Sequence, residues 1–258
     1  MISWKDYWNR SIEVFIQFDL AKKAMKSFRD TPEAVSNYAT EEIEKIKKDV
    51  LDHFGEKGKI PKESWLYDSN KVSKYIKDTM ESLPTKLEAV ENRLNQNHLI
   101  LQITLFESFM KDLHRELLQQ NPSFLNPERK ISLGRVVSLG LDHVINEEIE
   151  REVQSLDRKS IEDRCKYFQE RLSIDWSFAG TMIPVIKLIT DKRNKLLHED
   201  PDINVDQDDL TFASFACIGI TMVSTIQAHL AYPEAFILPE HSENTLQLFS
   251  KKKREPNK

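Results

Sequence analysis

The chain has 258 residues, with 37 Lys or Arg against 42 Asp or Glu and a net charge of −5, which excludes a protein that binds nucleic acid through its overall charge. Hydrophobic residues make up 40% of the chain and charged residues 31%, as in a folded helical protein with a large polar surface. Six glycines argue against barrels, sandwiches and phosphate loops, and two cysteines are too few for a disulfide framework.

Apolar residues at helical spacing predict helices over 11–27 and 41–54, followed by a loop rich in Gly, Pro and Lys over 55–65. We therefore expect residues 1–84 to form an N-terminal helical region. The first residues, MISWKDYWNR, are charged and aromatic and do not resemble a signal peptide. Together with the cysteine content, this predicts a cytoplasmic location.

The strongest pattern lies between residues 85 and 119. Its apolar residues recur at spacings of four and three, which predicts a helix with one face in a core: Leu99, Ile103, Phe106, Met110, Leu113 and Leu117. Further helices are expected over 133–153 and 160–172, and another ends at His198 with Pro184 near its first turn. The predicted fold is an all-α, antiparallel helical bundle, with a core domain over 85–240 and a basic, disordered tail over 241–258.

The segment from residue 210 to residue 232 contains no Asp, Glu, Lys or Arg. By length it could cross a bilayer, and a membrane-bound helical protein is one interpretation. The segment also carries many hydroxyl and amide side chains, which favours a helix buried on all sides within the bundle. We therefore predict no membrane association.

Motifs for common metal and phosphate chemistry are absent from the sequence. It has no His-Glu-x-x-His, Cys-x-x-Cys, Walker loop or Gly-x-Ser-x-Gly. His143 and Glu147, four residues apart on a predicted helix, could hold a metal ion, but helices rich in glutamate form such pairs by accident. We predict no metal and no cofactor.

The most informative stretch, DKRNKLLHED, ends an apolar helix and enters an acidic loop. Asn194 and His198 are four residues apart and share a helix face, whereas Arg193 lies about 140° away from His198 but has a long side chain. A permanent cation, an amide and an imidazole are the groups needed to move a proton while neutralising a phosphate. Lys192 and Lys195 flank them and could bind phosphates.

Two other interpretations of this stretch stay open. Arg193 could pair with Asp191 or Glu199 on the surface, and His198 could simply favour a helix C-terminus. In addition, the segment 93–98 has the same spacing of arginine and histidine. We favour the later segment because an asparagine directly follows its arginine and because its helix ends before a loop, where a substrate could enter.

The segment from Arg193 to His198 resembles the ribonuclease motif of HEPN domains (higher eukaryote and prokaryote nucleotide-binding). These domains are all helical, and their motif is Arg, four to six residues and then His, commonly with Asn or Asp after the Arg. The run NHLILQITLFESFMKDL resembles the family's early core helix, with Glu107 as the polar residue that reaches toward the site. The resemblance covers about residues 86–235 and leaves the first third of the chain unexplained.

The resemblance implies a metal-independent endoribonuclease that acts as a homodimer with a composite site. His198 of one subunit would be the base and its mate the acid, and Arg193 would stabilise charge on the phosphate. Asn194 and Glu107 would position them. A non-catalytic HEPN module that binds a nucleotide or a protein is the alternative.

The resemblance also implies a biological role. The chain would be a toxin or abortive-infection effector against RNA, controlled by an antitoxin or other regulatory protein. Some family toxins carry a Tyr two residues after the His, which a partner enzyme modifies. This sequence has Asp200 there, so we do not expect control by that route.

Overall fold

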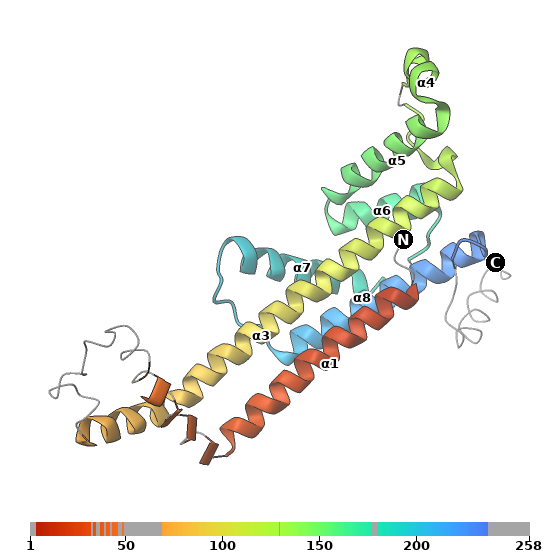
Figure 1. Ribbon diagram of the computed structural model, residues 1–258. Helices are drawn as coiled ribbons and strands as arrows, with labels where there is room; N and C mark the ends of the chain where they lie inside the picture. The colour runs from red at the N-terminus through yellow and green to blue at the C-terminus, as the bar shows by residue number, and fades with distance from the viewer. Residues whose placement is uncertain are drawn as a thin grey trace, which may run out of the picture. The chain divides into compact units, whose positions relative to one another are not determined.

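The computed structural model describes residues 4–31, 69–128, 130–176 and 180–236, and scattered helical positions between 33 and 48. All regular elements in these ranges are helices (Figure 1), which confirms the predicted all-α class. The elements are α1 (Trp4–Arg29), α3 (Ser69–Gln120), η2 (Pro122–Phe124), α4 (Leu133–Leu139), α5 (Leu141–Asp157), α6 (Ile161–Leu172), α7 (Met182–His198) and α8 (Gln207–Ala231).

The chain divides into two compact units that differ from the predicted domain ranges. The larger unit comprises residues 1–15 and 96–258, and the smaller unit comprises residues 16–95. Both dividing points fall inside helices, α1 and α3. The boundary that we placed after Pro84 also falls inside α3, which continues through the proline although it lacks an N–H to donate. The tail 241–258 and the loop 55–65 lie outside the described residues.

The core of the larger unit contains the apolar stripe predicted for residues 85–119. Each member of the stripe is at most 5% exposed: Leu99, Ile103, Phe106, Met110, Leu113 and Leu117. The ring of Tyr7 on α1 packs against Phe109 with ring centroids 5.2 Å apart. The start of α1 therefore belongs to the same core as α3.

The predicted single helix over 133–153 is wrong. The structure has two helices there, α4 and α5, and Gly140 separates them with a φ of +87°. Only glycine adopts this left-handed conformation readily, so the helix ends at this residue and a new one begins. Helix α5 then continues to Asp157, beyond the predicted end.

Helix α8 packs beside α7 (Figure 1) and corresponds to the predicted uncharged helix. By length and composition it could cross a membrane, yet 61% of its most apolar window is buried inside the protein, as in a core helix. It is not buried on all sides as predicted, because Phe212 and Phe215 are 56% and 65% exposed.

Gly219 is one point of contact between α8 and α7. A Cβ atom placed on this glycine would lie 2.2 Å from the sulfur of Met182, at the start of α7. At the other end of α7, Lys192 forms an ion pair with Asp209. Asp209 also belongs to the capping box that begins α8, together with Asp206. These contacts fix the helix that carries the candidate site.

Candidate functional site

The spacing of buried residues on α7 places Arg193 on the inner face of the helix. Ile186, Ile189 and Leu196 are buried on α7. Arg193 follows Ile189 by four residues and precedes Leu196 by three, so it belongs to the same stripe. Its side chain therefore points from α7 toward the neighbouring α3, where an apolar residue would normally stand.

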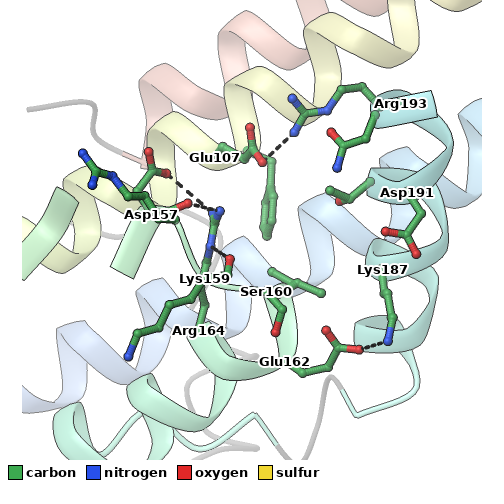
Figure 2. Close-up of a pocket in the computed structure, with 14 residues that line it drawn as sticks. Glu107, Asp157, Lys159, Ser160, Glu162, Arg164, Lys187, Asp191 and Arg193 are labelled. Carbon is green, nitrogen blue, oxygen red and sulfur yellow. Dashed lines mark hydrogen bonds and ion pairs between the residues drawn. The ribbon is translucent and has the colours of Figure 1, made fainter. Parts of the chain in front are cut away.

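Glu107 on α3 meets this side chain. One terminal nitrogen of the Arg193 guanidinium donates to Glu107 Oε1 at 2.6 Å (Figure 2), and the two side chains are only 15% and 23% exposed. Glu107 lies within the α3 stripe, between Ile103 and Met110, and is half buried. The surface pairing of Arg193 with Asp191 or Glu199 is not what the structure has.

The buried part of the guanidinium has donor capacity left. The Nε of Arg193 is buried and meets no hydrogen-bond acceptor within the described part of the chain. An unsatisfied buried donor of a charged group is costly, and the Nε leaves part of the hydrogen-bonding capacity of Arg193 unused. Glu107 holds the guanidinium in place while leaving this capacity.

Asn194 and His198 occupy the outer face of α7. Both are exposed, and they are one helical turn apart. His198 is the last residue of α7, and the next two backbone N–H groups, of Glu199 and Asp200, donate to the carbonyl of Lys195. Because Arg193 is directed at Glu107, the structure brings Arg193 and Glu107 together but does not join them to His198.

The two lysines predicted to bind phosphates differ in their surroundings. The ammonium group of Lys192 is bound to Asp209 of α8, so this side chain connects two helices. Lys195 is exposed on the outer face, one residue after Asn194. Of the pair, Lys195 is the one directed to solvent near His198.

The earlier segment with the same spacing has a different environment. Its histidine, His98, is 3% exposed, and its ring lies edge-on to Phe15 with centroids 6.2 Å apart. A general base must reach the proton that it abstracts. A buried ring of this kind is poorly placed for that role, which favours the segment from Arg193 to His198.

A pocket of about 560 Å³ opens beside Arg193 (Figure 2). Four parts of the larger unit form it: α3, the turn between α5 and α6, the start of α6, and α7. Its lining residues are Phe106, Glu107, Asp157, Arg158, Lys159, Ser160, Ile161, Glu162, Arg164, Lys187, Thr190, Asp191, Arg193 and Asn194. His198 is not among them and lies one turn beyond Asn194.

Sequence reasoning missed the basic residues on the far side of this pocket. Arg158 and Lys159 stand in the short turn between two helices, and Arg164 follows on α6. The signal was a basic dipeptide between two predicted helices, but nothing in the sequence indicated that this turn faces α7.

Three other kinds of group are candidates for chemistry in the described residues: a His–Glu pair, clusters of metal ligands, and the two thiols. The Nε2 atom of His143 lies 3.5 Å from Oε1 of Glu147, and Glu147 also forms an ion pair with Arg135. Within the described ranges, no group of three or more His, Cys, Asp or Glu side chains is placed to bind a metal. Burial raises the pKa of both thiols, to about 12 for Cys165, so neither Cys165 nor Cys217 is an available nucleophile.

Comparison with known proteins gives no match, whether with family models, curated proteins or solved structures. The HEPN resemblance thus depends on the residues of the motif and of the early core helix.

Proposed function

We propose that the chain is a metal-independent endoribonuclease of the HEPN type. The observation that supports this proposal most is the Arg193–Glu107 ion pair at the edge of a pocket, on the helix that presents His198 to solvent. Arg193 supplies a cation that Glu107 holds in a fixed position, and the exposed imidazole supplies a group that can exchange protons. RNA is the proposed substrate because it carries its own nucleophile, the 2′-OH.

The proposed reaction is an internal transesterification. A base removes the proton of the 2′-OH, the 2′-oxygen forms a bond to phosphorus, and the bond from phosphorus to the 5′-oxygen breaks. An acid gives a proton to the departing 5′-oxygen, so the products are a 2′,3′-cyclic phosphate and a 5′-hydroxyl. Arg193 would stabilise the charge on the non-bridging oxygens, while Glu107 and Asn194 would hold the reacting groups in place.

The mechanism needs both a base and an acid, and one chain offers a single exposed histidine at the motif. We therefore propose a homodimer in which two copies of His198 face a common cleft, one as base and one as acid. Lys192 and Lys195 would add positive charge near the RNA. The biological role proposed is that of a cytoplasmic toxin or abortive-infection effector, held in check by a regulatory protein.

RNA cleavage with and without EDTA tests this proposal. We expect cleavage to persist under chelation, and His198→Ala and Arg193→Ala each to slow it by about 10²- to 10⁴-fold. His143→Ala is the matched control, because His143 is also exposed, at 59%, but lies away from the motif. Helical circular dichroism of each variant checks that it is folded.

Two outcomes would contradict the proposal. Complete loss of cleavage in EDTA would refute metal independence. Equal behaviour of wild type and the His198→Ala variant, in cleavage and in growth of expressing cells, would instead favour a non-catalytic module.

A further inference from the structure

The pocket beside Arg193 is lined by carboxylates that are mostly neutralised from within the protein. Glu107 is paired with Arg193 and Glu162 with Lys187. The hydrogen bond from Lys187 lowers the pKa of Glu162, so this carboxylate is charged and engaged. Because each of these anions has its own cation, they do not repel a negatively charged ligand as free carboxylates would.

Asp157 is neutralised in the same way. Its carboxylate lies 2.8 Å from the ammonium group of Lys111 and 3.8 Å from the guanidinium of Arg164. Arg164 also donates to the backbone carbonyl of Lys159 at 3.0 Å and to that of Asp157. Arg164 thus holds the turn between α5 and α6 in a fixed shape against the start of α6.

The turn between α5 and α6 also carries two cations that are not used to neutralise a described carboxylate. Arg158 and Lys159 are exposed, and neither forms an ion pair with a described residue. Both residues line the pocket, and Lys159 lies across it from α7 (Figure 2). Among the described residues, Asp191 is the one carboxylate of the pocket that forms no ion pair, and it lies one turn after Lys187. The outer edge of the pocket therefore has an excess of positive charge.

The interior of the pocket suits a planar, hydrogen-bonding group. Its volume of about 560 Å³ lies within the range of small-molecule sites. Phe106 and Ile161 provide apolar surface, while Thr190 and the Asn194 amide provide hydrogen-bond donors and acceptors. A nucleobase combines these two requirements, and a phosphate attached to it would reach the basic edge.

We propose that this pocket binds one nucleotide of a single-stranded RNA, with the base inside and a flanking phosphate on Arg158 and Lys159. His198 lies about 6 Å further along α7 than Asn194, a displacement comparable with one step along a single strand. The next phosphate would then lie beside His198. The inference depends on the proposed ribonuclease function for its meaning, but nucleotide binding itself is measurable without cleavage.

Calorimetric titration of the full-length protein with the four 5′-mononucleotides tests the inference. Adenosine and inorganic phosphate serve as separate ligands, to divide the contribution of the base from that of the phosphate. We expect saturable binding of at least one nucleotide, and weaker binding of both fragments. The His143→Ala variant should bind as wild type does, because His143 lies on α5 outside the pocket.

Two variants probe the pocket itself. Arg158→Ala/Lys159→Ala should weaken nucleotide binding about tenfold, the loss expected when charge-assisted hydrogen bonds are removed. Thr190→Trp fills the pocket without changing its charge and should abolish binding. Lys130→Ala/Lys166→Ala is the matched control, since it removes two cations from exposed positions outside the pocket and should leave binding unchanged.

The results separate the two proposals. The inference would be overturned if the wild-type protein showed no saturable nucleotide binding, or if neither pocket variant changed that binding. It would also be overturned if inorganic phosphate bound as tightly as a nucleotide. If the protein cleaves RNA but binds no mononucleotide, the nucleotide-pocket inference is wrong and the ribonuclease proposal stands. If the protein binds a nucleotide but cleaves no RNA, the ribonuclease proposal is wrong and the nucleotide-pocket inference stands.

Discussion

Arg193 and Glu107 both stand in stripes that the helix period assigns to the core. Their 2.6 Å contact allows two charges to lie between α3 and α7 with little solvent exposure. Such a pair adds little net stability over apolar residues of the same size, yet removal of one partner leaves a poorly solvated charge behind. Its presence in a core position therefore suggests a purpose other than stability.

This arrangement predicts a double-mutant result. Glu107→Ala should lower the free energy of unfolding by about 1–3 kcal/mol, because Arg193 then lacks its acceptor. Glu107→Leu/Arg193→Met, which removes both charges and keeps the volume, should recover most of this loss. Urea unfolding followed by circular dichroism measures both values. A double variant no more stable than Glu107→Ala would contradict the idea.

At the residue scale, the sequence predicted part of the site. Glu107 was identified through the resemblance of its segment to the early core helix of HEPN domains, as the polar residue that follows Phe106. The direction of Arg193 was not, since a long side chain can reach either face until the neighbouring helix is known. The same uncertainty hid the partner of Lys192, which is Asp209 on α8.

At the scale of elements, the contact between α7 and α8 includes one residue without a side chain. Gly219 is buried in α8, and Met182 occupies the space where its Cβ would be. Met182 is a flexible side chain, so it can adapt to a small change but not to a large one. The start of α7 is thereby held against α8.

Gly219→Leu should lower the free energy of unfolding by about 1–3 kcal/mol, because the new side chain overpacks this contact. Met182→Ala introduced into the same variant should restore part of the loss by vacating the space. Thermal unfolding of the two variants against wild type measures both effects. If Met182→Ala brought no recovery in the Gly219→Leu background, the contact would not be the cause of the instability.

Some helices were predicted correctly from the sequence, whereas the ends of others were not. The buried stripe of α3 followed from spacing alone, because a continuous apolar face has one interpretation. The break at Gly140 did not, because the apolar spacing continues on both sides and only the positive φ ends the helix. At Pro84 the error was the reverse: the proline predicted a boundary, but α3 continues through it.

At the scale of the whole molecule, a polar group inside the core makes stability depend on pH. His114 is 1% exposed, and its Nε2 lies 3.2 Å from the hydroxyl of Tyr167, which donates to Glu152 at 3.1 Å. Burial, assisted by the charge of Arg115, lowers the pKa of His114 to about 3. The folded protein therefore keeps this imidazole neutral where the unfolded chain would protonate it.

Because the unfolded state binds the extra proton, stability should fall as pH decreases from about 6.5 toward 3. One proton contributes up to about 1.4 kcal/mol per pH unit. Urea unfolding at pH 7 and pH 5 measures this slope, and His114→Gln should reduce the difference between the two pH values by about 2 kcal/mol. Identical slopes for wild type and variant would assign the pH dependence to other groups.

The acidic loop between α7 and α8 has a consequence for any strand that reaches His198. Exposed carboxylates follow the histidine directly, on Glu199, Asp200 and Asp202. Arg158 and Lys159, which form no ion pair with a described residue, lie beyond the opposite end of the motif, on the α5–α6 turn. Over the roughly 8 Å within which charges act in physiological salt, a polyanion is attracted on one side of His198 and repelled on the other. The part of an RNA that contacts the protein would therefore end at His198. Cleavage would then occur near one end of the RNA segment that is bound.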